Sequence, residues 1–547
     1  MTTDKLKHVV LVACCAALCA DACAADKVKF IGTGWDLGRR TPEQILAQAD
    51  ELAATGLDGV AIGVPHVKSA SGKVYNRDYT MTVAFFTKEI ADGYVPVFRK
   101  ITAKDGLRHS FIHCNWCPIA GKRLDWSDNA AWAAFASNMQ AIAYLAKKGG
   151  LEGISVDPED YGLKGQFHRA AEDDVSVSKA QSLARQRGRE IGRAMFEEFP
   201  CARVLMYHLF GIEKSYYDTQ CPKAAAYTKG ALLPPFMDGI FDVMPPTAVI
   251  VDGDENAYGF RAERRDFEAS VAGRLTKMSM LLSPENRGKY RAQTSFGFGL
   301  YLDAYFREKN RKTGFDENLA AAARATDEYV WIYGEKSRWI DWHDFSCPGW
   351  MKISPLTWET RMPGLANALA RQKDLHAWAI RTADDLKDKK SANLIAKALA
   401  KPATWQSDKL QQRGVFSSVP GAGIHGSTLL KAENVRSGCF MPGVSGLATG
   451  DELIAEAYVR GDGSMHLRWT RGGNWEWGAG GVIGVAGQPD KDGWRRMTVY
   501  AKVPEGIDGV RLKMDAHDMP GLHTEFSGVA VWRIRSAERE NGKEQSK

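Results

Sequence analysis

Short runs of β-branched and aromatic residues alternate with longer segments of helical periodicity from residue 28 to about residue 365. The short runs have the length of strands, and their regular alternation with helices is typical of a parallel sheet. Eight strands are expected, over residues 28–35, 57–64, 109–116, 153–158, 202–209, 247–252, 292–302 and 329–333. Eight consecutive strand–helix repeats predict an α/β fold, the (β/α)8 TIM barrel.

The ends of the intervening helices are also marked in the sequence. A helix over residues 41–55 is expected because Thr41-Pro-Glu-Gln44 combines an N-cap, a first-turn proline and a capping glutamine, and Gly56 follows. Further helices are expected over residues 129–148 and 178–198. An open, doubly wound sheet is the alternative, but Leu37 stands where the third glycine of its phosphate-binding turn belongs.

The pattern changes after Pro402 to short alternating runs separated by Gly, Asp and Pro. Such runs are typical of an all-β sandwich or jelly roll. Four clear strands are expected over residues 452–459, 465–470, 496–503 and 509–514. The expected organisation is a signal peptide (1–25), a barrel catalytic domain (26–365), a helical linker segment (366–414), a β-sandwich domain (415–537) and a charged tail (538–547).

The first 25 residues combine a basic start, a short apolar run and a small-residue cleavage site ending at Ala25. This arrangement predicts a cleaved secretory signal peptide and a secreted or periplasmic protein. A lipoprotein anchor at Cys14 is the alternative, because Leu11-Val-Ala-Cys14 resembles a lipobox. No later run of about 18 apolar residues is present, so no integral membrane segment is expected.

Charge and cysteine content narrow the range of partners. The net charge of +6 is spread among acidic residues without a continuous basic stripe, which argues against a nucleic-acid partner. Cys114 and Cys117 form a C-x-x-C pair, but no second such pair or paired histidine accompanies them to complete a zinc site. We therefore expect no metal and no cofactor.

Candidate catalytic residues lie where the expected strands end, because the active site of a TIM barrel is at that face. The fourth strand ends in Gly153-Ile-Ser-Val-Asp157-Pro-Glu159. Residues two apart on a strand point the same way, so Asp157 and Glu159 are expected to face the barrel mouth together. Solvated, purely structural carboxylates are the alternative interpretation.

This segment resembles the strand-four signature of chitinase-like glycoside hydrolases, Asp-Gly-x-Asp-x-Asp-x-Glu. Gly153, Asp157 and Glu159 match it, whereas Glu152 and Ser155 occupy its first two acidic positions. The resemblance implies that Glu159 is the general acid and that Asp157 positions the acetamido group of a substrate.

Glycosidases need a second carboxyl group, as nucleophile or base. Glu335 follows the eighth strand after one glycine, and Glu255 lies in a polar turn after the sixth strand, which ends at Asp252. Glu335 is the favoured candidate because a rigid strand holds catalytic geometry better than a turn. The alternatives are a salt-bridged Glu335 and a catalytic Glu255.

Other polar and aromatic residues at strand ends are expected to bind substrate, with ordinary hydrogen-bonded structure as the alternative. They are Trp35, Asp36, His113, Trp116, Tyr207, His208, Asp252, Tyr258 and Tyr333. Chitinase-like barrels use a mouth tyrosine to support the reaction intermediate, and Tyr207 is the residue here that this resemblance implies.

The C-terminal domain resembles the galactose-binding-like jelly rolls that serve as carbohydrate-binding modules. Trp475 and Trp477 would share one face of an extended segment, where they would either stack on sugar rings or fill the sandwich core. Together these observations predict an exported glycoside hydrolase that cleaves a polysaccharide or glycoconjugate by carboxylate acid/base catalysis. The alternative is a non-catalytic carbohydrate-binding or scaffold protein on a decayed barrel, and a lyase or transglycosylase also fits.

Overall fold

A computed structural model describes residues 28–118, 123–159, 165–169, 175–210, 230–307, 314–407, 414–435, 437–516 and 523–535. The chain divides into two compact units, Met1–Lys373 and Asp374–Lys547. The signal peptide expected over residues 1–25 and the charged tail expected over residues 538–547 lie outside the described residues.

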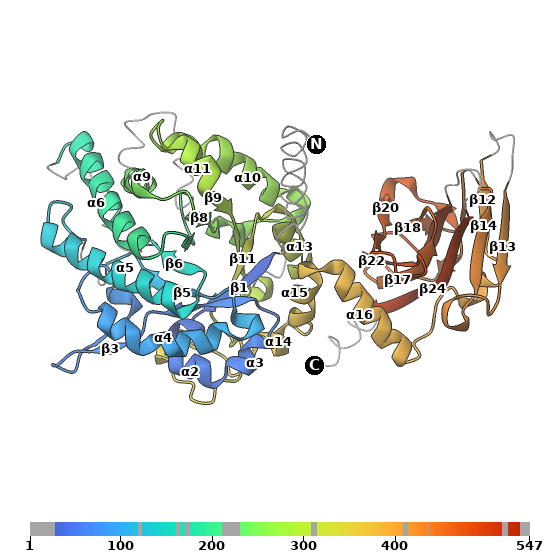
Figure 1. The fold of residues 1–547 in the computed structure, drawn as a ribbon, viewed down its shortest axis with the longest axis horizontal. Coiled ribbons are helices and arrows are strands. Elements are labelled where there is room, and N and C mark those ends of the chain that lie inside the picture. Colours follow the sequence, from blue (N-terminus) through green and yellow to red (C-terminus); the bar gives the residue numbers. More distant parts are fainter. Residues whose placement is uncertain are drawn as a thin grey trace, which may run out of the picture. The chain divides into compact units, whose positions relative to one another are not determined.

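The first unit is a barrel of parallel strands surrounded by helices (Figure 1). The strands are β1 (Lys29–Gly34), β2 (Gly59–Gly63), β5 (Phe111–Asn115), β6 (Gly153–Asp157), β7 (Arg203–Met206), β8 (Val249–Asp252), β9 (Thr294–Phe296), β10 (Phe298–Tyr301) and β11 (Tyr329–Gly334). Only Gly297 separates β9, which pairs with β8, from β10, which pairs with β11. These two segments form the seventh barrel strand and close the ring, so the predicted TIM barrel of eight strands is confirmed.

The helices follow the sequence signals closely. The main ones are α2 (Pro42–Ala47), α3 (Ala49–Ala53), α4 (Lys88–Thr102), α5 (Asn129–Gly149), α6 (Val177–Glu198), α9 (Leu233–Val243), α10 (Asp266–Thr276), α11 (Arg287–Gln293), α13 (Phe315–Ala325) and α15 (Leu365–Lys373). Thr41 and Gln44 form the predicted capping box, although the helix that they begin breaks at Gln48 into α2 and α3. Among the described helices, none is both long and apolar enough to cross a membrane.

Two apolar layers hold the barrel together. Its interior is filled by large side chains, namely Ile31, Phe111, Leu205, Tyr207, Val251, Tyr329 and Trp331. A larger core lies between strands and helices and includes Trp116, Trp132 and Phe236. The carboxyl ends of the strands therefore stand on a packed interior, and the βα loops above it carry the polar residues.

The second unit is an all-β sandwich, as predicted, made of two antiparallel sheets. One contains β12 (Thr404–Gln406), β15 (Gly438–Phe440), β16 (Gly443–Ser445), β18 (Gly463–Arg471), β19 (Asn474–Trp475), β20 (Gly481–Ile483) and β23 (Gly509–Ala516). The other contains β13 (Val415–Val419), β14 (Leu429–Glu433), β17 (Glu452–Arg460), β21 (Val485–Ala486), β22 (Arg495–Lys502) and β24 (His523–Arg535). Apolar side chains such as Leu453, Leu467 and Leu512 fill the sandwich core.

The segment expected as a linker is divided between the two units. Helix α15 belongs to the barrel unit, whereas α16 (Leu375–Asp388) belongs to the sandwich unit. An ion network attaches α16 to the second sheet: Arg496 contacts Asp384 at 2.6 Å and the fully buried Glu456 at 2.5 Å, and Lys387 also pairs with Glu456. A buried carboxylate needs such partners, so α16 is an integral part of the sandwich.

Helices α6 and α9, which follow the fourth and fifth barrel strands, approach each other through glycines. A Cβ atom on Gly188 would lie 1.9 Å from the carbonyl oxygen of Phe236, and one on Gly239 would lie 2.0 Å from that of Arg185. Only glycine permits this backbone contact, which sets the positions of two strands that carry candidate site residues.

We predict that Gly239→Ala lowers the free energy of unfolding by about 1–3 kcal/mol, because the added methyl group overpacks the contact between the two helices. Urea denaturation followed by circular dichroism would measure the change. Gly93→Ala in α4 is the matched control, because a Cβ atom there meets open space. The control is expected to gain about 0.5–1 kcal/mol from helix propensity, and equal losses in both variants would contradict the role of the contact.

Candidate functional site

The polar side chains that follow three neighbouring barrel strands, β6, β7 and β8, lie close together at the mouth. In the parallel register, Val156 of β6 pairs with Met206 of β7, and Met206 pairs with Asp252 of β8. Because parallel strands end side by side, the residues that follow these pairs converge. The chemistry of the mouth therefore comes from the segments immediately after β6, β7 and β8.

The turn after β8 is held rigidly against the end of β7. The Gly253 amide donates to the Met206 carbonyl at 2.8 Å, and the Glu255 amide donates to the Tyr207 carbonyl at 3.1 Å. Asp254, with a left-handed φ of 39°, makes the turn between them. Glu255 therefore lies in a turn, as predicted, and its backbone continues the hydrogen bonding of the sheet.

Glu159, His208 and Glu255 form a polar cluster at the mouth, the acid cluster. One ligand atom from each of the three side chains lies within 4.8 Å of the others. His208 Nε2 is 2.7 Å from Glu255 Oε2, and the Glu159 amide donates to Asp157 Oδ1 at 2.8 Å. Four candidate residues predicted from sequence, Asp157, Glu159, His208 and Glu255, are thus brought together.

The burial and charge of this cluster shift two pKa values. Burial raises the pKa of Asp157 to about 7, and the nearby negative charge of Glu255 adds to the effect. Burial disfavours protonation of His208, but the hydrogen-bonded carboxylate of Glu255 outweighs it, so the pKa of His208 is raised. Near neutral pH, the cluster therefore holds exchangeable protons, as acid/base chemistry requires.

An aromatic stack forms the floor beneath the cluster. The Tyr207 ring lies between His113, at 5.3 Å between centroids, and Trp331, at 4.2 Å. The Tyr207 hydroxyl shares a 3.1 Å hydrogen bond with Thr33. Burial raises the pKa of Tyr207 and lowers that of His113 well below its ordinary value, so both rings stay neutral.

Glu335, the favoured second carboxylate, makes different contacts. Its amide donates to Asp303 at 2.7 Å, its carboxylate is 3.4 Å from the Tyr333 hydroxyl, and Lys336 lies 3.5 Å away. Tyr333 in turn stacks on Tyr258 at 6.0 Å. The structure groups Glu255 with Glu159, because the turn after β8 reaches beside β7, whereas the contacts described for Glu335 are with Asp303, Tyr333 and Lys336.

Three predicted substrate-binding residues are turned away from solvent. Trp116 is fully buried against Phe135 and Phe236. Asp36, also fully buried, accepts hydrogen bonds from the Trp339 amide and the Trp342 indole. Asp252 is 1% exposed, and its carboxylate lies 3.8 Å from the buried Arg274. These placements do not fit contact with a substrate, because each side chain serves the packing of the barrel.

Two other aromatic candidates remain accessible. Trp35 is half-buried, lies edge-on to the exposed Trp350 at 5.5 Å, and carries the Lys336 ammonium 3.7 Å above its ring. In the sandwich, Trp477 is 77% exposed and stacks on Trp475 at 5.9 Å. The pair in the sandwich therefore lies outside its core, and its binding of sugar stays a prediction.

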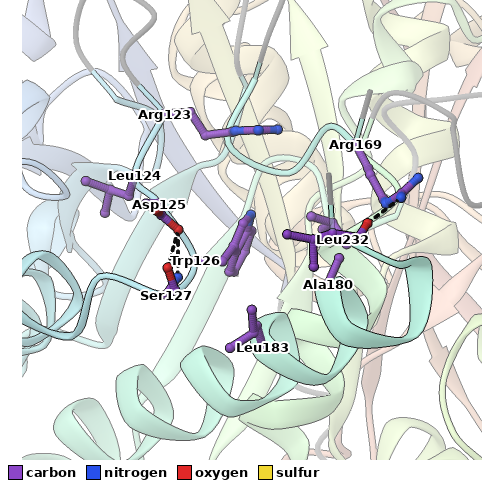
Figure 2. A pocket seen from close by; sticks show the side chains of 10 residues that line it. Arg123, Leu124, Asp125, Trp126, Ser127, Arg169, Ala180, Leu183 and Leu232 are labelled. Carbon is purple, nitrogen blue, oxygen red and sulfur yellow. Dashed lines mark hydrogen bonds between the residues drawn. The ribbon is translucent and has the colours of Figure 1, made fainter. Parts of the chain in front are cut away.

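A cavity of about 380 Å³ lies among the loops at the same end of the barrel. Figure 2 shows its lining, which includes Arg123, Trp126 and Arg169 from the segments after β5 and β6, with Leu183 from α6. Arg123 donates to the His168 carbonyl, and Arg169 donates to the Val175 carbonyl. None of the predicted site residues lines this cavity, so it is distinct from the acid cluster.

Sequence reasoning missed two polar residues at the mouth, Asn115 and Arg77. Asn115 ends β5, pairs in register with Asp157, and donates to Asp78 at 2.8 Å. Its position at the end of a strand could have marked it as a site residue, but it lies within the Cys114–Cys117 pattern, which was considered only as a metal site. Arg77 comes from a loop after β2, and no local pattern marks it.

The acid cluster also has the donor set of a metal site. Two carboxylates and one imidazole are ligands that divalent Mn, Fe or Zn accepts, and the three ligand atoms are close enough to share one ion. The residues present therefore fit a divalent cation, held by Glu159, His208 and Glu255, although none was expected from the sequence.

No family model and no curated protein match the chain. Solved structures similar to it include an α-amylase from Geobacillus thermoleovorans complexed with acarbose (10% identity, 89% of this chain and 98% of that one, TM-score 0.33). They also include a 3-keto-D-glucoside 4-epimerase from E. coli (13% identity, 63% of this chain and 99% of that one, TM-score 0.32). A third is a Clostridium thermocellum endo-1,4-beta-D-xylanase complexed with xylohexaose (13% identity, 26% of this chain and 27% of that one, TM-score 0.19). The chain thus spans about a quarter of that xylanase. These neighbours are carbohydrate-acting enzymes, but such low TM-scores leave the function to be argued from the site.

Because the folded-state pKa of Asp157, about 7, exceeds the unfolded value, its ionised form destabilises the fold. That destabilisation is complete above pH 7 and disappears as the pH falls towards 4. We predict that Asp157→Asn, which keeps the oxygen that accepts from the Glu159 amide, is more stable than the wild type at pH 8 by up to about 4 kcal/mol. Urea denaturation at pH 8 and at pH 5, with a chelator present to remove metal ions, would measure the free energy of unfolding. Asp105→Asn, at an exposed position, is the control. An equal gain at both pH values would contradict the prediction.

Proposed function

We propose that this protein is a glycoside hydrolase that cleaves a polysaccharide or glycoconjugate with Glu159 and Glu255 as its two carboxyl groups. The observation that carries the proposal is their proximity at the barrel mouth, within 4.8 Å between ligand atoms, above a neutral aromatic floor. Retaining glycosidases place two carboxyl groups about 5–5.5 Å apart, and inverting ones need about 6.5–9.5 Å. The spacing therefore favours retention of the anomeric configuration.

In the first step, Glu159 donates a proton to the glycosidic oxygen while a Glu255 oxygen attacks the anomeric carbon and the leaving sugar departs. In the second step, Glu159 takes a proton from water, the water oxygen bonds to the anomeric carbon, and the bond to Glu255 breaks. Glu159 ends protonated and Glu255 ends ionised, so the enzyme returns to its starting state.

The neighbours of the two glutamates have supporting roles in this proposal. His208 contacts Glu255 at 2.7 Å and orients its carboxylate towards the mouth. Asp157 accepts from the Glu159 amide and so orients the segment that carries the acid. Indole and phenol faces such as those of Trp35 and Tyr258 suit the apolar faces of sugar rings.

We further propose that the protein acts outside the cytoplasm, on the strength of the signal-peptide pattern in residues 1–25. The exposed stack of Trp475 and Trp477 in the sandwich supports a role in holding the same glycan. A non-catalytic glycan-binding protein would bind members of a glycan panel without releasing reducing ends from any of them.

The expected result for Glu159→Gln or Glu255→Gln is a fall in kcat of about 10²–10⁴-fold, because each amide keeps the shape but loses the proton transfer or nucleophile. A broad glycan panel with reducing-end detection would identify the substrate, and NMR of the first product would show anomeric retention. Glu335→Gln is the matched control and should lose less than about tenfold. A larger loss in Glu335→Gln than in Glu255→Gln would transfer the role to Glu335.

A second candidate function, a metal-assisted carbohydrate reaction, is favoured by the ligand set of Glu159, His208 and Glu255. The hydrolase proposal predicts that dialysis against EDTA leaves glycan cleavage within about twofold of the untreated rate, since the two carboxyl groups suffice. Activity that disappears on chelation and returns with Mn²⁺ or Zn²⁺ would favour the metal-assisted reaction. Metal analysis of the purified protein by mass spectrometry would provide an independent readout.

A further inference from the structure

Two arginines, Arg39 and Arg77, lie on the side of the mouth formed by β1, β2 and β5. Arg77 lies in a 3-10 turn, η2 (Arg77–Tyr79), in the loop after β2. Its guanidinium packs over Gly38, where an added Cβ would lie 2.6 Å from Nη1, and its Cδ approaches Gly63 at the end of β2. This packing places the guanidinium above the carboxyl ends of the first two barrel strands.

Arg77 has few partners for a side chain that is only 21% exposed. Its one ion pair among the described residues is a 3.6 Å contact from Nε to Asp78, and no hydrogen bond from its Nη atoms is formed there. Arg77 shares Asp78 with Asn115, because Asp78 Oδ1 also accepts a hydrogen bond from the Asn115 amide at 2.8 Å. One face of the guanidinium packs against Gly38, and its two NH2 groups keep N–H donors that no described residue uses.

The positive charge of Arg77 affects the pKa values of two residues inside the mouth. Burial is the main cause of the low pKa of His113, and Arg77 lowers it further. Burial also raises the pKa of Tyr207, which stacks on His113 in the aromatic floor, and there the charge of Arg77 acts against the effect of burial. Asn115 connects the two sides, since it pairs in register with Asp157 and its side-chain amide donates to Asp78 at 2.8 Å. A ligand spanning the mouth would meet the acids on one side and Arg77 on the other.

A second arginine adds to this side of the mouth. Arg39 ends the 3-10 turn η1 (Leu37–Arg39) after β1, and its buried Nε has no hydrogen-bond partner among the described residues. Burial is the main cause of the lowered pKa of His66, which follows β2. The charges of Arg39 and Arg77 lower this pKa further, while those of Asp78 and Glu43 raise it, so both arginines lie near the same point of the mouth.

We propose that Arg77, supported by Arg39 and Asn115, forms an anion subsite, and that the substrate is a glycan bearing a carboxylate or sulfate group. This inference rests on the proposed glycosidase function and names its substrate class. A guanidinium binds planar carboxylates and sulfate oxygens with paired N–H donors, and a partly buried one does so with little competition from water. The anion would bind on the β1–β2 side while the scissile bond lies over Glu159 and Glu255, away from their like charge.

The experiment compares acidic oligosaccharides with their neutral counterparts. Oligogalacturonate and its carboxyl-reduced form make one pair, and chondroitin sulfate oligosaccharide and its desulfated form make the other. For the wild-type full chain, calorimetric affinity for the acidic member of one pair should exceed that for its neutral member by about ten- to a hundredfold, the scale of one charge-assisted hydrogen bond. A preference within the oligogalacturonate pair would identify the anion as a carboxylate, and a preference within the chondroitin sulfate pair would identify it as a sulfate.

Arg77→Gln should abolish that preference and leave affinity for the neutral member within about threefold, whereas Arg77→Lys should restore part of it. Arg108→Gln removes the same charge from an exposed arginine in the turn before β5 and should change neither affinity. Equal binding of both members by the wild type, or an unchanged preference in Arg77→Gln, would overturn the inference. Anion-dependent binding without cleavage would retain the subsite and reject the hydrolase, and thermal unfolding would confirm that each variant is folded.

Discussion

The parallel register of β6, β7 and β8 is the constraint on which the site depends. Each of these strands is buried on both sides, by the barrel interior and by the helices, so its register cannot slip without exposing apolar residues. With Val156, Met206 and Asp252 aligned, the next residues of three separate segments must meet. The turn after β8 extends this alignment through the Glu255 amide, and that hydrogen bond places Glu255 beside His208.

Concentrating carboxylates at one point has an energetic consequence. Burial raises the pKa of Asp157, and the negative charges of Glu255 and Glu159 raise it further. The surrounding structure compensates by rigid support: Trp331 donates to the Gly253 carbonyl at 2.7 Å, and Arg274 donates to the Asp252 carbonyl at 2.8 Å. Destabilised groups held by an overdetermined scaffold are a common feature of catalytic sites.

The charged residues of the mouth come from different strands. The two glutamates of the acid cluster follow β6 and β8, whereas Arg39 and Arg77, the latter beside Asp78, lie in segments after β1 and β2. Beneath them, the rings of His113, Tyr207 and Trp331 form one neutral aromatic stack. A glycan in such a mouth would be oriented by its charge before any bond is broken, which links the substrate class to the chemistry of the acids.

The sequence by itself determined the architecture, because hydrophobic periodicity and helix caps are local. The eight barrel strands, the Thr41 capping box and the sandwich strands β17, β18, β22 and β23 all follow from patterns within short windows. The carboxylates after β6 were equally visible, since strand ends in a barrel face one side.

Tertiary structure alone decided which of the candidates meet. Trp116 and Asp36 have the same sequence context as true mouth residues, but helix packing and the loop containing Trp339 bury them. Glu255 joins Glu159 through a hydrogen bond to Tyr207, a residue 48 positions earlier, and Arg77 reaches the mouth through contact with Gly38. Such contacts depend on how distant segments pack, and no local pattern of residues encodes that packing.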